Sequence, residues 1–114
     1  MTLEEILSNI NYNIKKIVEE LRKRIIFREQ MNVDDRNIIY QHSGEDFCIV
    51  RIKKNYLEID FKADKIIEDP MEFSWKIKQT RDQKFNRRMQ IKNICDIDIA
   101  FGLIFQSYNC VTYE

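Results

Sequence analysis

The chain has few of the residues on which many catalytic and metal sites depend. It contains two glycines and one histidine among 114 residues. Two isolated glycines cannot form a glycine-rich phosphate-binding loop, and His42 alone excludes a metal site with two histidine ligands. The three cysteines, Cys48, Cys95 and Cys110, are far apart and show no CxxC spacing. An odd, scattered set favours reduced thiols and therefore a cytoplasmic location.

Net charge and long apolar runs are lacking as well. Nineteen basic residues balance nineteen acidic residues, so no overall field attracts the chain to nucleic acid or to a membrane surface. No apolar run approaches the roughly 18 residues of a membrane-spanning helix, and the N-terminus has no signal-peptide core. We therefore expect residues 1–114 to form a single cytoplasmic domain without membrane contact, metal or cofactor.

Residues 46–63 contain two runs in which apolar and polar residues alternate, and this pattern predicts an antiparallel β-hairpin. A two-residue loop at Lys54 and Asn55 places Arg51 opposite Glu58, where the two side chains form a cross-strand ion pair. A four-residue loop would keep the same register. A shift by one residue would turn a whole strand over. The predicted register gathers six apolar residues on one face: Cys48, Val50, Ile52, Leu57, Ile59 and Phe61.

Apolar residues at helical spacing predict a long N-terminal helix within residues 1–26, over about residues 3 to 26. A capping box formed by Thr2 and Glu5 begins it. Part of the apolar set keeps the heptad spacing of a coiled coil, which admits a dimer. Ile6 and Val18 widen the apolar stripe and favour packing against the sheet of the same chain.

Residues 37–42 predict a further strand, joined to the hairpin by a turn at residues 43–44. A two-residue turn there sets Tyr40 opposite Phe47. The face opposite the main core would then hold four apolar side chains: Ile38, Tyr40, Phe47 and Ile49. A sheet that is apolar on both faces needs a second cover, supplied by a helix or by a partner subunit.

The second half of the chain predicts another hairpin. Residues 73–78 and 85–92 alternate apolar and polar side chains, and a corner at residues 81–83 pairs Trp75 with Met89. Such a hairpin would keep the aromatic and aliphatic side chains of both strands on one apolar face.

The last element is a helix that begins at Asp96, a good N-cap residue, and ends near Asn109. Strands that follow one another with short links make a meander, and helices at both ends of the chain then cover it. The predicted fold is therefore α+β, an antiparallel meander sheet of about five strands with long N-terminal and C-terminal helices packed on it.

Three features coincide in the C-terminal three quarters of the chain. A hairpin with a lysine-rich corner runs from Phe47 to Phe61, the dipeptide at residues 69–70 is Asp-Pro, and residues 96–108 read DIDIAFGLIFQSY. Together they resemble a bacterial domain of unknown function found at the C-terminal end of predicted transport proteins and nuclease-like proteins. The resemblance covers about residues 36–110. It implies an α+β domain that is accessory to nuclease-like or restriction-like modules and has no established chemistry of its own.

One catalytic candidate stands out. Asp46 at the start of one strand and Asp60 with Lys62 on the next resemble the Mg²⁺-binding motif of PD-(D/E)xK nucleases. The predicted register argues against a shared site, because Asp60 and Lys62 face away from the core whereas Asp46 lies on the side of Cys48. A bulge would be needed to bring the three together. The alternative is a set of alternating, solvent-facing charges.

A basic segment is the strongest binding signal. Residues 74–93 hold seven basic residues against one acidic residue, Asp82, with the aromatic residues Trp75 and Phe85 among them. Basic and aromatic side chains on one side of a hairpin can follow a phosphate backbone. The candidate nucleic-acid contacts are Arg81, Lys84, Arg87 and Arg88. The alternatives are contact with a partner protein or a solvated sheet face.

The expected function is therefore that of a non-catalytic accessory or interaction module with a protein partner or a second copy of itself. Its association with nucleic-acid-processing or defence systems is implied by the family resemblance. Direct nucleic-acid binding through the basic hairpin is one alternative, and a Mg²⁺-dependent nuclease that uses Asp46, Asp60 and Lys62 is another.

Overall fold

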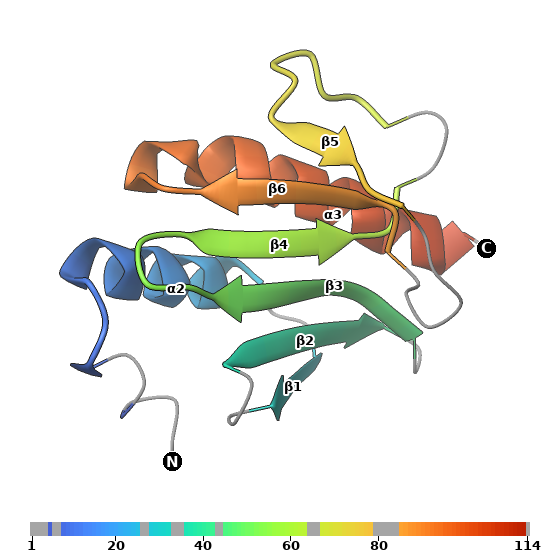
Figure 1. Ribbon diagram of the computed structural model, residues 1–114. Coiled ribbons are helices and arrows are strands. Elements are labelled where there is room, and N and C mark those ends of the chain that lie inside the picture. The colour runs from blue at the N-terminus through green and yellow to red at the C-terminus, as the bar shows by residue number, and fades with distance from the viewer. Residues whose placement is uncertain are drawn as a thin grey trace.

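The computed structural model describes residues 5, 8–25, 28–32, 36–42, 45–63, 67–78 and 85–113, with the side chains of 28–32, 42 and 110–113 outside the description. In chain order the elements are α2 (Tyr12–Arg24), β1 (Arg28–Asn32), β2 (Asn37–His42), β3 (Glu45–Ile52), β4 (Leu57–Phe61), β5 (Ser74–Lys76), β6 (Arg87–Ile91), the short 3-10 helix η1 (Ile94–Asp96) and α3 (Ile97–Tyr113). The strands form one antiparallel sheet in the order β1-β2-β3-β4-β6-β5. Helices α2 and α3 lie behind this sheet in Figure 1, and in the part of the chain that the structure describes no helix lies on its front face. We call that front face the open face.

The predicted α+β class, with an antiparallel sheet and helices from both ends of the chain, is confirmed. The sheet has one strand more than the sequence indicated, because β1 pairs with β2 at one edge. Its order also departs from a simple meander, since β6 lies between β4 and β5. Met89 and Ile91 of β6 are fully buried opposite Ile59 and Leu57 of β4. β5 has only three residues and takes the edge.

The central hairpin has the predicted register. Cys48 pairs with Phe61, and Ile52 pairs with Leu57. The backbone N–H of Lys53 donates to the carbonyl of Tyr56 across the two-residue loop, at 3.0 Å. All six apolar side chains of the predicted face are at most 3% exposed. Burial of this face against the helices selects the register, as the alternation requires.

A β-bulge corrects the prediction for β2 and β3. Tyr40 pairs with Cys48, whereas the next residue, Gln41, pairs with Asp46. Phe47 is therefore the extra residue on β3, and its side chain is fully buried. The predicted pairing of Tyr40 with Phe47 is wrong, and so is the second apolar face. Ile38 and Tyr40 lie on the core side and are 2% and 1% exposed, so the open face needs no second cover.

The N-terminal helix is shorter than predicted. α2 begins at Tyr12 after an N-cap at Asn11, whose side chain accepts a hydrogen bond from the Asn13 N–H at 2.8 Å. Just before it, Ser8 Oγ and Asn9 Nδ2 both donate to the carbonyl of Glu5. Ser and Asn side chains that bond nearby backbone compete with a continuous helix, which explains the break. Thr2 of the predicted capping box lies outside the described residues.

The apolar stripe of α2 serves the core of its own chain. Its four buried residues are at most 2% exposed within the same cluster as the sheet residues: Ile14, Ile17, Val18 and Leu21. Helix α2 therefore packs against the sheet of its own chain, which is the alternative to a coiled coil that the sequence left open. On the outer side, Arg24 forms an i,i+4 ion pair with Glu20 at 3.2 Å.

The second hairpin pairs one residue out of the predicted register. Ser74 lies opposite Met89 and is 5% exposed, while Trp75 lies opposite Arg88 and is 43% exposed. The prediction that Trp75 pairs with Met89 on the apolar face is wrong, because the inward position is held by Ser74. The hydrogen bonds of Ser74, described below, compensate for placing a polar residue there.

The C-terminal helix α3 packs its inner side against the sheet. Ile97, Ala100, Leu103 and Ile104 are buried, and the buried Ser107 Oγ donates to the Phe47 carbonyl at 2.8 Å. This bond satisfies the backbone of the residue that the bulge displaces. In the described part of the chain, no helix is long and apolar enough to cross a membrane.

Candidate functional site on the open face of the sheet

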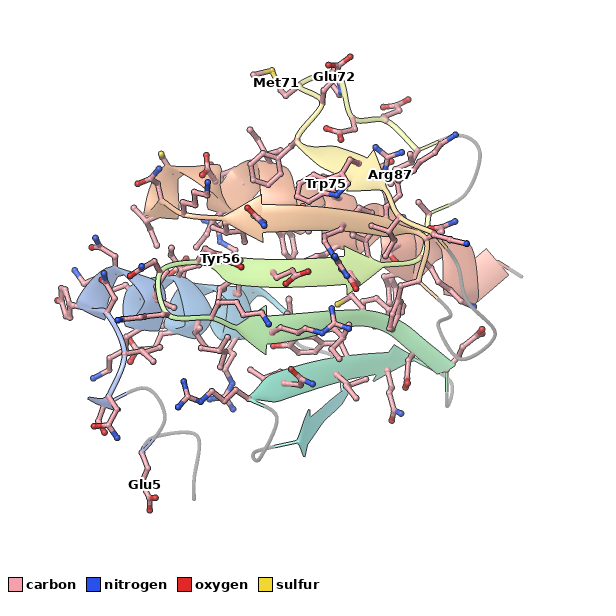
Figure 2. The ribbon with its side chains drawn as sticks, in the orientation of Figure 1. Glu5, Tyr56, Met71, Glu72, Trp75 and Arg87 are labelled. Atoms are coloured by element: carbon pink, nitrogen blue, oxygen red, sulfur yellow. The ribbon has the colours of Figure 1, made fainter. Side chains whose placement is uncertain are left out.

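A buried carboxylate lies at the centre of the open face. Asp60 of β4 has no exposed surface, although no helix of the described residues covers this side of the sheet (Figure 2). Its carboxylate accepts hydrogen bonds from Arg51 Nη1 at 2.6 Å and from Arg88 Nε and Nη2 at 2.7 and 3.0 Å. The two arginines come from the strands on either side, β3 and β6. Their side chains are 27% and 32% exposed, so they cover Asp60 and still reach solvent.

Further ion pairs extend this cluster along the strands. Arg88 Nε also lies 2.6 Å from Glu58 Oε1, and Lys53 Nζ lies 3.9 Å from Glu58 Oε2. Glu58 does stand opposite Arg51 in the strand pairing. Arg51, however, pairs with Asp60, two residues further along β4, because Arg88 of β6 already lies close to Glu58. We call Arg51, Lys53, Glu58, Asp60 and Arg88 the open-face ion cluster.

The environment of Asp60 keeps it ionised. Burial alone would raise the pKa of Asp60, but the hydrogen bonds from Arg88 and Arg51 and their positive charges outweigh burial and lower it. A carboxylate with a lowered pKa is a weak base, and its oxygens are already occupied by guanidinium donors. Asp60 therefore orders the two arginines and is poorly suited to proton transfer or metal binding.

The three candidate nuclease residues lie on strands β3 and β4 or just beyond them. The bulge brings Asp46 opposite Gln41, whose Nε2 donates to Asp46 Oδ1 at 2.5 Å. Because Gln41 follows the inward-facing Tyr40, this pair lies on the open face, the side of Asp60. Lys62 forms an ion pair with Glu45. Among the described residues, no group of three or more His, Cys, Asp or Glu side chains could hold a metal ion.

Cys48 and His42, the other reactive side chains considered from sequence, are not assembled into a site. Cys48 is fully buried in the core, and burial raises the pKa of its thiol. A buried thiol of this kind stays protonated and inert. His42 is the last residue of β2, and its side chain lies outside the described residues. Cys95 is a free, exposed cysteine.

No protein-family model, curated protein or solved structure matches the chain. The resemblance drawn from Phe47–Phe61, residues 69–70 and residues 96–108 therefore stays an expectation. The candidate site is argued from its own geometry.

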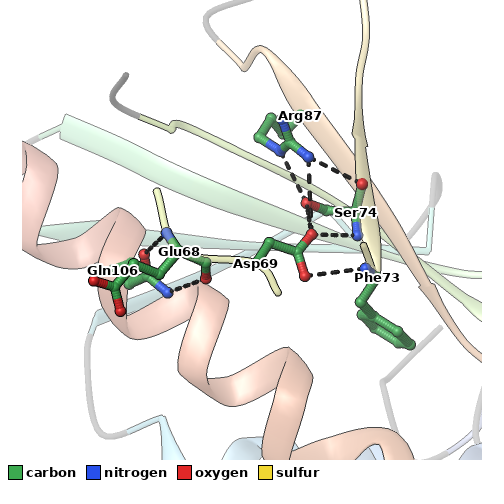
Figure 3. A network of polar contacts seen from close by, with 6 residues as sticks. All are labelled: Glu68, Asp69, Phe73, Ser74, Arg87 and Gln106. Atoms are coloured by element: carbon green, nitrogen blue, oxygen red, sulfur yellow. Dashed lines mark hydrogen bonds and ion pairs between the residues drawn. The ribbon is translucent and has the colours of Figure 1, made fainter. Parts of the chain in front are cut away.

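A second polar network fixes the edge of the sheet beside this face (Figure 3). Asp69 Oδ2 accepts hydrogen bonds from the Ser74 N–H at 2.8 Å and the Ser74 hydroxyl at 2.7 Å, and Oδ1 accepts one from the Phe73 N–H at 3.0 Å. Arg87 donates to the Ser74 hydroxyl and to the Ser74 carbonyl. The loop before β5 is also held to α3, because the Gln106 amide exchanges two hydrogen bonds with the Glu68 backbone.

We expect Asp69→Asn to lower the free energy of unfolding by about 2 kcal/mol at neutral pH, because an amide leaves at least one of these donors without an acceptor. Burial tends to raise the pKa of Asp69, but its bonds from Ser74 and Phe73 lower it overall. A carboxylate with a lowered folded-state pKa stabilises the fold above its unfolded pKa, about 3.9, and loses this effect as the pH falls through the folded value. Urea unfolding of both proteins checks this: their difference should shrink below about pH 4, and a difference that does not depend on pH would contradict it.

The four predicted nucleic-acid contacts divide into two pairs. Arg87 and Arg88 belong to the two networks just described, whereas Arg81 and Lys84 lie outside the described residues. The neighbouring Lys76, Lys78 and Lys92 are exposed. Trp75 is half-exposed directly opposite Arg88 and lies on the open face near the β5 end of the sheet (Figure 2).

Sequence reasoning missed both networks. The open-face ion cluster joins β3, β4 and β6, so predicting it required knowing that β6 and not β5 lies beside β4. The alternation of residues did place Asp60 and Arg51 on one face. The Asp69 network required the inward position of Ser74, for which the local sequence contains no signal stronger than that for Trp75.

Proposed function

We propose that this protein is a non-catalytic interaction module and that the open face binds a protein partner. The observation that carries the proposal is the buried Asp60 carboxylate, which holds Arg51 and Arg88 in fixed positions on a face that neither α2 nor α3 covers. Side chains ordered in advance lose little entropy on binding. The partner belongs to nucleic-acid-processing or defence systems, a part of the proposal that rests on the family resemblance alone.

The composition of the open face supports a protein partner. Trp and Arg are the residue types that most often dominate protein interfaces, and here Trp75 stands directly opposite Arg88. The open-face ion cluster has three positive and two negative charges, a net charge of only +1, so it has little excess positive charge to attract phosphate. A Trp beside ordered guanidinium groups offers both apolar area and hydrogen-bond donors to a partner surface.

Affinity capture with matched variants tests the proposal. We expect the tagged wild-type protein to enrich one partner or a few from a lysate of its own source cells, and Trp75→Ala to lose that enrichment about tenfold or more. Tyr12→Ala is the control, because Tyr12 is 65% exposed at the start of α2. Equal enrichment by all three proteins would contradict the proposal.

Nucleic-acid binding is the second candidate, and the exposure of Trp75 beside Lys76 and Lys78 favours it. An exposed aromatic ring with basic side chains nearby can stack a base while the lysines contact phosphate. A gel shift with single-stranded DNA that weakens with salt and is lost in an Arg81→Ala/Lys84→Ala variant would support this function instead. Absence of a shift at low salt would eliminate it.

The nuclease alternative has a direct assay. Mg²⁺-dependent cleavage of DNA that disappears in Asp46→Ala would establish a hydrolase and contradict the interaction module. We expect no cleavage, because the oxygens of Asp60 are bound by two arginines and Lys62 is paired with Glu45.

A further inference from the structure

The outer side of α3 differs from the rest of the surface. Of the 17 residues of α3, Asp98 is the one acidic or basic residue, in a chain that is 33% charged. Its carboxylate is already paired with Arg24 at 2.5 Å. The neighbouring helix α2 lies on the same side of the sheet (Figure 1) and ends in three consecutive basic residues. Surface helices normally carry charged and polar residues on the side that faces away from the core, and α3 carries one charged residue.

Aromatic rings line this outer side. Phe105 is 48% exposed, and Phe101 and Tyr108 are partly exposed on either side of it. The ring of Phe105 lies 6.5 Å from that of Phe101 and 6.2 Å from that of Tyr108, between centroids. Tyr108 in turn makes an edge contact with the buried Phe47 at 5.7 Å. The exposed ring therefore belongs to a continuous aromatic row that begins in the core.

Gly102 is the second observation. It is exposed in the middle of α3, and a Cβ added there would meet nothing within 4 Å. Packing within the chain therefore does not require a glycine, although glycine in a helix interior costs about 1 kcal/mol relative to alanine. On a helix, positions 102 and 105 lie three residues apart and share a face. The missing side chain leaves open space on the outer side, which we call the hollow at Gly102, three residues before Phe105.

We propose that the outer side of α3 is a homodimer interface, in which Phe105 of each copy packs into the hollow at Gly102 of the other. The charge balance selects this occupant. Apart from Asp98, which is already paired with Arg24, α3 offers a partner no charge for an ion pair. A charged partner would therefore lose the hydration of its own groups against this helix, whereas an aromatic surface with as little charge is complementary, and a second copy of α3 is such a surface. The pairing is self-complementary, as a twofold dimer requires.

This inference goes beyond the function proposed for the open face, and it replaces the reasons for a dimer that the sequence suggested. The heptad residues Ile14, Ile17 and Leu21 are buried in the chain's own core. The predicted second apolar face is absent, because Ile38 and Tyr40 are buried on the core side. The α3 surface lies on the opposite side of the sheet from the open face, so a dimer leaves the open face accessible.

Sedimentation equilibrium of the isolated chain tests the dimer. We expect the mass of the wild-type protein to rise with concentration from 13.9 kDa towards twice that value, with a Kd in roughly the micromolar range. Phe105→Glu should weaken the dimer at least about tenfold, because it buries a charge in an apolar contact. Tyr12→Glu is the matched control, since it also places a charge at an exposed aromatic position, outside the proposed interface. Its mass should rise with concentration as that of the wild-type protein does.

Gly102→Leu makes the test independent of any folding defect in Phe105→Glu. A Cβ at this position meets no other atom within 4 Å and leucine favours the helix, so the Tm of the monomer should rise by roughly 4 °C while the dimer weakens at least about tenfold. A wild-type protein that stays monomeric at all concentrations would overturn the proposal, and so would a dimer that both α3 variants retain. Neither result bears on the capture experiment with Trp75→Ala, which concerns the other side of the sheet.

Discussion

Replacing Asp60 with asparagine is expected to lower the free energy of unfolding at neutral pH by about 3 kcal/mol, the lower end of the range for breaking a buried ion pair. The amide leaves Arg51 and Arg88 close together without the charge that balances them. Both guanidinium groups keep some contact with water, which limits the loss. In a domain of this size the melting temperature should fall by roughly 12 °C. Chemical denaturation followed by circular dichroism measures the change.

Asp98→Asn is the matched control for this variant. Asp98 also pairs with an arginine, at 2.5 Å, but its side chain is 83% exposed. Exposed ion pairs contribute little to stability, so this substitution should leave the unfolding free energy almost unchanged. Equal losses in the two variants would mean that burial of Asp60 has no energetic consequence, and would contradict the role given to it in ordering the open face.

Phe47→Ala should have the largest effect of all, a loss of about 4 kcal/mol in unfolding free energy. Phe47 is the extra residue of the bulge in β3, its ring is fully buried, and it contacts Tyr108 of α3. Removal of the ring leaves a cavity between the sheet and α3. Equilibrium unfolding in urea measures the loss.

The size of this effect tests the bulge itself. Without the bulge, Phe47 would lie on the open face, and truncating it would change stability by about 0.5 kcal/mol or less, as is usual for surface positions. Trp75→Ala is the control, because it removes another large aromatic side chain, one that is 43% exposed on that face. A loss for Phe47→Ala no greater than that for Trp75→Ala would contradict the observed register.

The central hairpin could be predicted from sequence because the alternation in both of its strands points to one register only. The same rule failed between β2 and β3, where Tyr40 and Phe47 are both apolar and a bulge lets both face the core. Alternation cannot reveal an inserted residue when the residues on either side of it are also apolar. The correction matters for the site, because the bulge also turns Asp46 towards the open face.

The predictions of the N-terminal helix and of the second hairpin failed for different reasons. Ser8 and Asn9 donate hydrogen bonds to nearby backbone and Asn11 accepts one, and these bonds interrupt the predicted helix before α2, although the apolar spacing continues through them. In the second hairpin, the bonds of Ser74 with Asp69 and Arg87 make a polar inward position favourable. The spacing of apolar residues indicates which side chains are buried, but it does not predict specific polar contacts of this kind.

The bonds that hold Ser74 have a consequence for solubility. An edge strand normally presents N–H and C=O groups without hydrogen-bond partners, and another chain can pair with them as a new strand, the first step towards fibrils. In β5 the Ser74 N–H is bound by the Asp69 carboxylate and its carbonyl is bound by Arg87. A further strand would have to displace both side chains, so the β5 edge of the sheet resists edge-to-edge association with other chains, even in a concentrated solution.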